Sequence, residues 1–515
     1  MVTMMVMTVT ATMAAAASNH TFLSDVSMPI VLLALLLGSL AALAPGGKRQ
    51  KAAGIFSTAL LAALFAATTP MLLQTGVGRI FPLFAAQFLG SASLFADGMS
   101  SVLVPMTLLL AAAVSLYATR DTCGADCGGG QGSAPRRGFF TLLLLYVAGM
   151  VGLFESSNLI LFFVFFELML VSSWLLIGFW GSGRSLASGM KYFMYTEFGA
   201  LLLLLGILAY GGATGSMDLL AMQQAPELTS AVAVAVALMT TGILVKSAAF
   251  PLHSWLPDTY CSAPTAASAL LSYSTVAVGG YALLRVFQSF APAMLEDGNL
   301  MLALSLVGLV NIVYGGIIAM RQSDMKRLLA YSSISQVGYM LIGVASSAYL
   351  GFLGVVIWAV AHGLGKSALF MIAGIFRRYA GSDDLSRLSG LAGRMPITSS
   401  MLLASFLSLA GIPPLLGFWG EIFIFLGYAY SAVGGAPDYA RLAVVAAGVV
   451  ATVISAGYAL LAVRRALYGA PNDLAQNSKD PPASLWVPVV LSVLALCVLG
   501  IFPSIVTGAF WIYVP

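Results

Sequence analysis

Long apolar stretches recur along most of the chain, and short connections rich in Gly, Pro, Asn and charge separate them. A membrane-spanning helix needs about 20 predominantly apolar residues. Stretches of about that length can be placed at 29–46, 54–73, 99–118, 138–154, 157–180, 192–212, 228–250, 261–287, 299–320, 328–348, 350–376, 397–429, 440–463 and 484–511. The pattern therefore predicts an all-α polytopic membrane protein with about fourteen transmembrane helices. None of the connections is long enough to hold a soluble catalytic domain.

Basic residues are distributed unevenly over these connections. The odd-numbered ones carry Lys48, Arg49, Lys51, Arg120, Arg136, Arg137, Arg184, Lys191, Arg321, Lys326, Arg327, Arg377, Arg378, Arg387, Arg394, Arg464, Arg465 and Lys479, and the even-numbered ones only Arg79, Arg285 and Arg441. Because cytoplasmic loops are enriched in Lys and Arg, we expect the odd-numbered connections to be cytoplasmic. The chain would then be a multi-pass protein of the plasma (inner) membrane with both termini outside.

Residues 1–28 precede the first span and are expected to be a leader or an outward-facing segment. Within them, residues 1–17 are apolar and contain no Lys or Arg. A signal peptide normally has a positively charged start. A disordered leader, a cleaved peptide and an extra short helix therefore all stay open.

The composition agrees with a membrane protein and narrows the function. Hydrophobic residues make up 60% of the 515 residues and charged residues 8%, whereas a soluble domain has about 25% charged residues. The formal net charge is only +4, and the basic residues are scattered, so no nucleic-acid partner is expected. Cys123 and Cys127 lack a second ligand pair, so no metal site is expected either.

Five ionisable residues lie inside predicted spans, where a charge facing lipid would cost about 2.5–3.5 kcal/mol each. They are Glu167, Lys246, His362, Lys366 and Glu421. One interpretation is that they form buried ion pairs that fix the register of the helices. The other is a proton relay, the more usual role for a set of acids and bases within a membrane.

Two of these residues lie near prolines that should break their helices. Pro251 follows Lys246 by five residues and deprives the carbonyl of Ser247 of its helical hydrogen bond, and Pro413 and Pro414 act likewise before Glu421. Irregular backbone at membrane depth survives only where it is buried or lines a water-filled cavity. The breaks fall in the seventh and twelfth spans, and paired broken helices are typical of transporter repeats. The spacing predicts two inverted five-helix repeats.

Two histidines, each with a charged residue nearby, need separate interpretations. His362 and Lys366 are four residues apart and share a helix face, which favours a relay, because histidine exchanges protons near neutral pH. His253 and Asp258 lie just beyond the first break. They could form a half-channel or gate, or they could anchor the turn; both alternatives stay open.

Several motifs resemble the proton-pumping antiporter-like subunits of respiratory NADH:quinone oxidoreductase. They are FADGMSSVLVPMTLLL (95–110), FFELMLVSSWLLIGFWG (165–181), KSAAFPLHSWLPDTYCSAPTAASALL (246–271), DMKRLLAYSSISQVGYM (324–340), HGLGKSALF (362–370), SGLAGRMP (389–396) and GIPPLLGFWGE (411–421). The resemblance runs from about residue 80 onward. The same superfamily includes subunits of multisubunit sodium/proton antiporters and of energy-converting hydrogenases.

The resemblance implies fourteen helices, two inverted five-helix repeats and broken seventh and twelfth helices. It implies that Glu167 and Lys246 form a coupled pair, and Glu421 at the twelfth-helix position is similar to the M-type subunit, the counterpart of mitochondrial subunit 4. Two departures are visible. Ala277 stands where M-type subunits usually have a lysine, with Ser272, Tyr273, Ser274 and Thr275 nearby, and Lys366 resembles the L-type and hydrogenase-type subunits.

We therefore expect a proton-translocating subunit of a redox-driven NADH:quinone oxidoreductase-type complex, which carries no cofactor itself. Its partners would be other membrane subunits, the lipid bilayer and protons, with sodium as the alternative ion. A sodium/proton antiporter subunit or a hydrogenase subunit is the alternative, and a spacer that has lost pumping is a third. The expected organisation is helices 1–3 (29–118), the first repeat (138–287), the second repeat (299–463) and a last helix (484–515).

Overall fold

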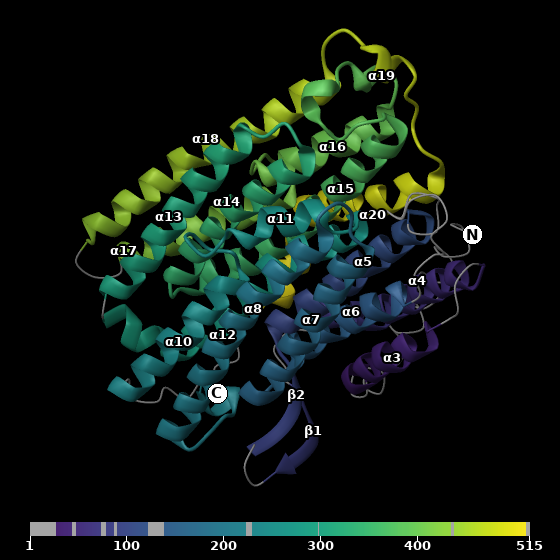
Figure 1. Cartoon of the computed structure of the whole chain (residues 1–515). Helices are drawn as coiled ribbons and strands as arrows, with labels where there is room; N and C mark the ends of the chain where they lie inside the picture. The colour runs from purple at the N-terminus through teal and green to yellow at the C-terminus, as the bar shows by residue number, and fades with distance from the viewer. Residues whose placement is uncertain are drawn as a thin grey trace.

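The computed structural model describes residues 27–43, 48–73, 79–86, 90–121, 138–222, 229–296, 298–433 and 437–510. These residues form one bundle of long helices that run side by side (Figure 1). The predicted leader up to residue 26, together with Cys123 and Cys127, lies outside the described residues.

The first half of the bundle contains α3 (Ser27–Ala41), α4 (Lys48–Thr68), η1 (Thr69–Leu73), β1 (Arg79–Ala86), β2 (Gly90–Ala96), α5 (Gly98–Asp121), α6 (Phe139–Glu155), α7 (Leu159–Trp180), α8 (Ser185–Thr214), α9 (Leu219–Met222), α10 (Ser230–Lys246), α11 (Trp255–Ser262) and α12 (Thr265–Glu296). The second half contains α13 (Gly298–Met320), α14 (Met325–Ala345), α15 (Tyr349–Tyr379), η2 (Leu385–Arg387), η3 (Leu391–Gly393), α16 (Pro396–Leu409), α17 (Leu416–Val433), α18 (Tyr439–Leu467), α19 (Asp473–Gln476), α20 (Ala483–Ile501) and α21 (Ser504–Ala509).

The helices confirm the predicted polytopic helical fold. Within the described residues, 11 helices are long and apolar enough to cross a membrane, and α3, α6, α10 and α16 are shorter apolar helices. Each predicted span contains at least one of these helices. In the seventh span α10 ends at Lys246 and α11 follows after a break, and the twelfth span is divided between α16 and α17, so the chain breaks near the prolines that predicted it.

A β-hairpin corrects the purely helical prediction. Strands β1 and β2 pair antiparallel, with Arg79 opposite Ala96 and Ala86 opposite Gly90. The hairpin projects from one end of the bundle, while α19 lies toward the other end (Figure 1). We call these the hairpin end and the basic end, because the connections at 181–184, 321–324 and 380–395 lie at the latter. A short hairpin has too few residues to span a membrane, so a search for long apolar windows missed it.

Two matching junctions favour the two-repeat prediction. At the hairpin end, Asn158 caps α7 and forms an isolated bridge with Asp218. At the basic end, Asp324 caps α14 and forms an isolated bridge with Asp384. The equivalent helices therefore start at opposite ends of the bundle, as inverted repeats require. The full extent of each repeat stays a prediction.

The helices differ in how much of their surface is buried, which distinguishes the centre of the bundle from its edge. The most apolar windows of α12 and α15 are completely buried, whereas about a third of those of α4 and α18 is buried. Helix α8 has two faces, because Phe198 and Leu201 are exposed while Tyr192 is buried. On its inner side α8 approaches α10 closely, since a Cβ on Gly199 would lie 2.9 Å from the carbonyl oxygen of Gly242.

Candidate functional site

The first helix break holds a buried lysine amine. Helix α10 ends at Lys246, which is 2% exposed. The Nζ atom of Lys246 donates to the hydroxyl of Tyr192 on α8 at 2.8 Å. The ring of Phe166 lies 5.6 Å from the same amine. The amine is thus enclosed by aromatic rings and one hydroxyl.

Neighbouring helices hold the broken backbone around this lysine. Trp255 on α11 donates its indole N–H to the carbonyl of Val245 at 3.1 Å, which satisfies a carbonyl in the last turn of α10. The amide of Phe250 donates to the Oδ1 atom of Asn311 on α13 at 3.0 Å. The side chains of α11 and α13 therefore replace hydrogen bonds that a continuous helix would have made.

Glu167 lies near Lys246 but not in contact with it. Within the described residues no ion pair of 4.0 Å or less joins the two side chains. In the described part of the chain, Lys246 and Glu197 are close enough to act electrostatically on Glu167, and its Oε1 atom is buried without a hydrogen-bond partner there. The implied coupled pair is therefore separated in this structure, and the hydroxyl of Tyr192 takes the place of the carboxylate beside the amine.

His253 and Asp258 lie in different surroundings. The Nε2 atom of His253 is 3.0 Å from the hydroxyl of Tyr314 on α13. Asp258 is 41% exposed at the basic end, where Lys191 approaches it to 2.7 Å and Arg327 to 3.7 Å. The structure does not bring His253 and Asp258 into contact, and both the gate and the anchor interpretations stay predictions.

Helix α12 carries hydroxyls where the expected lysine is absent. Ala277 is fully buried. One turn earlier, the hydroxyl of Thr275 is 2.8 Å from that of Tyr260, and Ser274 is hydrogen-bonded to Tyr146. Ser274 and Thr275, two of the residues that the sequence places near Ala277, thus have hydroxyls that are hydrogen-bonded to buried tyrosines.

Helix α15 places a histidine and a lysine against α14. Lys366 is fully buried and donates to the carbonyl of Leu329 at 2.8 Å and to the hydroxyl of Ser332. His362, also fully buried, has its Nε2 atom 3.4 Å from the hydroxyl of Ser333. Both side chains therefore face the same neighbouring helix, as their spacing predicted.

The second helix break lies beside Glu421. Helix α16 ends at Leu409, and Gly411 takes a φ of 67° directly against the carboxylate of Glu421. The amide of Gln336 on α14 donates to the carbonyl of Leu409 at 3.4 Å and to the hydroxyl of Tyr458 at 2.6 Å. Tyr458 is in turn within electrostatic reach of Glu421.

The five predicted relay residues thus form two groups. Glu167 and Lys246 lie among α7, α8 and α10, whereas His362, Lys366 and Glu421 lie among α14, α15 and α17. The buried hydroxyls of α12 lie between the two groups, because α12 packs against both α10 and α15. Sequence reasoning missed Tyr192, Ser332, Ser333, Gln336 and Tyr458, because a polar uncharged residue on a buried helix has no distinctive pattern.

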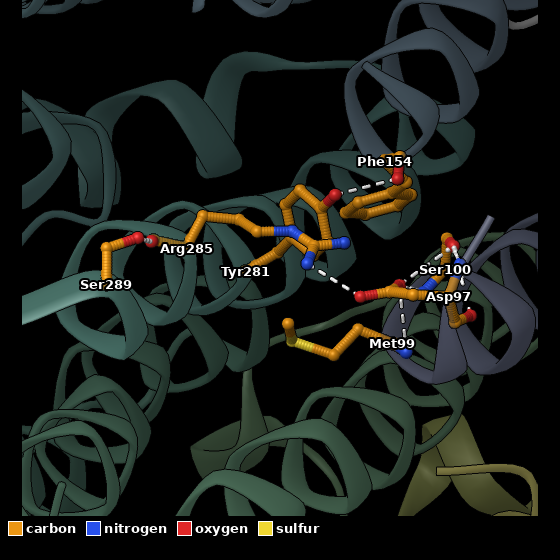
Figure 2. A network of polar contacts seen from close by, with 7 residues as sticks. All are labelled: Asp97, Met99, Ser100, Phe154, Tyr281, Arg285 and Ser289. Carbon is orange, nitrogen blue, oxygen red and sulfur yellow. Dashed lines mark hydrogen bonds and ion pairs between the residues drawn. The ribbon is translucent and has the colours of Figure 1, made fainter. Parts of the chain in front are cut away.

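A buried ion pair at the hairpin end was also missed. Nη1 of Arg285 lies 2.6 Å from Oδ2 of Asp97, and both side chains are almost completely buried (Figure 2). The sequence tally assigned Arg285 to a connection, which is wrong, because α12 continues to Glu296 and Arg285 lies within it. No group of three His, Cys, Asp or Glu side chains in the described part of the chain could hold a metal ion.

Comparisons with known proteins give concordant matches. Residues 156–455 match the family described as NADH:quinone oxidoreductase/Mrp antiporter, TM. The F(420)H(2) dehydrogenase subunit M of Methanosarcina mazei is 31% identical over 430 residues, which cover 81% of this chain and 82% of that protein. The NAD(P)H-quinone oxidoreductase chain 4 1 of Picosynechococcus sp. is 33% identical over 432 residues, which cover 81% of this chain and 76% of that protein.

A solved structure has the same overall arrangement. A chain of respiratory complex I from Thermus thermophilus with bound NADH superposes with a TM-score of 0.81 and 25% identity. The match covers 93% of this chain and 96% of the other. The likeness therefore extends well beyond the residues matched by the family model.

Proposed function

The chain belongs to the NADH:quinone oxidoreductase/Mrp antiporter family of membrane proteins, and from that premise we propose that it translocates protons as a membrane subunit of a redox-driven complex. The protons move along the buried line of side chains that begins at Glu167 and Lys246, passes the hydroxyls of α12 and continues through Lys366 to Glu421. The position of Glu421 favours an M-type subunit.

One observation carries the proposal: in the described part of the chain, the two lysines buried inside predicted spans have no carboxylate partner. Lys246 contacts a tyrosine hydroxyl, and Lys366 contacts a serine hydroxyl and a carbonyl. Neither has a carboxylate oxygen within 4.0 Å in the described part of the chain. The alternative of register-fixing ion pairs requires such contacts, so the arrangement disfavours it.

The chemistry of these contacts suits a group that both takes up and gives up a proton. A buried ammonium without a counter-ion is costly, but a hydroxyl or carbonyl oxygen can accept a hydrogen bond from it. In the described part of the chain, no fixed carboxylate therefore holds these two amines in the charged form. A small change in the distance from Glu167 to Lys246 would change the electrostatic stabilisation of a charge on Lys246, because electrostatic interactions are stronger in a medium of low dielectric constant.

The driving change comes from outside this chain in our proposal. The chain itself performs no redox chemistry and holds no flavin, cluster, haem or quinone, and neighbouring membrane subunits transmit the energy of electron transfer. The basic end faces the cytoplasm, because Lys and Arg concentrate in its connections. The hairpin end then faces outward.

A sodium/proton antiporter subunit is the second candidate, because the family model that matches the chain includes Mrp antiporters. The same buried amines and carboxyls could carry protons there without any redox partner. Affinity purification through this chain separates the two candidates. Recovery of soluble subunits with clusters or flavin supports the redox-driven complex, and recovery of membrane subunits alone supports the antiporter.

The proposal is tested in sealed vesicles that contain the complex purified through this chain. Proton pumping and electron-transfer rate are compared between the wild type, Glu167→Gln and Lys246→Ala. We expect pumping to be lost from assembled complexes. A matched control is Lys479→Ala, which removes an exposed lysine. Unchanged pumping in both test variants would refute the relay.

A further inference from the structure

Two sets of buried polar atoms at the hairpin end have no protein partner. Glu155, the last residue of α6, is fully buried, and neither of its carboxyl oxygens has a hydrogen-bond partner in the described part of the chain. Arg285 is 2% exposed, and its Nε and Nη2 atoms are also without a partner there. One set can only donate, whereas the other accepts when it is ionised.

Asp97, by contrast, has its carboxylate fully engaged. Its Oδ2 atom accepts from Nη1 of Arg285 at 2.6 Å, and its Oδ1 atom accepts from the amides of Met99 and Ser100 at 3.1 and 3.0 Å (Figure 2). Asp97 therefore fixes one side of the guanidinium and caps the start of α5. The Nε and Nη2 atoms of Arg285 are left without a hydrogen-bond partner in the described part of the chain.

Tyr281 connects the two unpartnered sets. Its hydroxyl donates to the carbonyl of Phe154, the residue before Glu155, at 2.7 Å (Figure 2). The guanidinium carbon of Arg285 lies 4.7 Å from the centre of the Tyr281 ring. Tyr281 is within electrostatic reach of Glu155, Asp97 and Arg285 together. The unpartnered donors and acceptors thus lie around one tyrosine.

Buried donors and acceptors of this kind are normally joined by water. A buried water makes two to four hydrogen bonds to polar groups that would otherwise have none. The free N–H groups of Arg285 supply donors, and the carboxyl of Glu155 supplies acceptors. Water between them would satisfy both sets and would also conduct protons.

We propose that Glu155 is a proton-binding group at the hairpin end, and that water held by Arg285 beside Tyr281 connects it to the outside of the bundle. Asp97 cannot serve, because its oxygens are engaged, and Arg285 stays charged beside it. Glu155 is the acid here with unfilled hydrogen-bonding capacity. This inference rests on the proposed function and gives its protons a release site, distant from Asp258 at the basic end.

The hairpin lies directly beside the site. Asp97 directly follows β2, and the hydroxyl of Ser157 lies 2.5 Å from that of Ser93 on β2. The segment after Glu155 is therefore attached to the hairpin, whereas Phe154 before it is hydrogen-bonded to Tyr281 on α12. In this proposal, the water path from Glu155 leads out beside the hairpin.

The test uses the complex purified through this chain and reconstituted in liposomes. Pumping per electron is measured for the wild type, Glu155→Gln, Arg285→Lys and the matched control Ser156→Ala. Ser156 neighbours Glu155, and its hydroxyl donates to the carbonyl of Gly152 on α6 at 2.6 Å. We expect Glu155→Gln to lose pumping, Arg285→Lys to reduce it, and Ser156→Ala to pump as the wild type.

Infrared difference spectroscopy during turnover supplies an independent readout. A protonated carboxyl band that shifts in D₂O and disappears in Glu155→Gln supports a water-accessible acid. If Glu155→Gln does not assemble, Glu155→Asp keeps a carboxyl and should move the band. An unchanged spectrum in the variant that assembles overturns the inference.

The outcomes also separate this inference from the proposed function. Normal pumping in Glu155→Gln, together with lost pumping in Lys246→Ala, overturns the release site alone and leaves the relay in place. Normal pumping in both variants overturns the relay and the release site together.

Discussion

Replacing Tyr192 by phenylalanine isolates one hydrogen bond of the relay. The substitution removes the hydroxyl that accepts from Nζ of Lys246 at 2.8 Å, but it keeps the ring, whose centre lies 5.1 Å from the same atom. Ser173 loses its 2.7 Å contact with Tyr192 but keeps its hydrogen bond to the carbonyl of Met169. Packing around Lys246 should therefore change little.

The size of the effect follows from the charge on the lysine. A hydrogen bond to a charged group contributes about 1.5–3 kcal/mol, and each ~1.4 kcal/mol is tenfold in an equilibrium constant. Losing the hydroxyl should therefore slow the proton transfer that passes through this contact by roughly ten- to a hundredfold.

The assay is proton pumping per electron in sealed vesicles. We expect Tyr192→Phe to pump less than the wild type, because Nζ of Lys246 loses its hydrogen-bond acceptor. Tyr195→Phe is the matched control, because Tyr195 lies on the same helix, is 38% exposed and contacts Ser254 rather than Lys246.

Two results would refute this reasoning. Equal pumping by Tyr192→Phe and the wild type would show that the hydroxyl does not support proton transfer. Equal loss in Tyr192→Phe and Tyr195→Phe would show that the effect arises from general disturbance of α8.

Three further changes test other parts of the structure. Gly411→Ala forces a side chain into a left-handed conformation and should lower the stability of the solubilised chain by about 1–2 kcal/mol; an unchanged thermal unfolding midpoint would contradict this. Asp97→Asn leaves the charge of Arg285 buried and uncompensated and should cost about 3–5 kcal/mol, which the same unfolding assay measures. Asp258→Asn should change stability by less than about 1 kcal/mol, because exposed ion pairs contribute little, and a larger loss would show that Lys191 and Asp258 anchor the turn.

The sequence predicted the spans and both helix breaks because each leaves a local pattern. Apolar runs of span length are set by the thickness of the membrane, and Pro251 and Pro413 remove backbone donors wherever they stand. The structure agrees closely: α10 ends at Lys246 and α16 at Leu409. The resemblance to the respiratory subunits is confirmed by the family match.

The partners of the buried charges could not be predicted in the same way. Asp97 and Arg285 are separated by 188 residues in the chain, and no local pattern connects positions so far apart. Tyr192 is one of 19 tyrosines, and only packing selects it as the partner of Lys246. The resemblance implied a carboxylate beside that amine, whereas the structure has a hydroxyl there and holds Glu167 farther away.

Helix α8 offers a direct mechanical route from the surface of the bundle to the amine of Lys246. Phe198 and Leu201 are exposed on the outer face of α8, whereas Tyr192 is buried on its inner face. A neighbouring subunit that binds the outer face would therefore displace the helix that holds Tyr192. The close approach of Gly199 to Gly242 leaves little space for α8 to slide without moving α10. A force applied to the outer face of α8 would therefore change the contact that the hydroxyl of Tyr192, on the opposite side of the same helix, makes with the amine of Lys246.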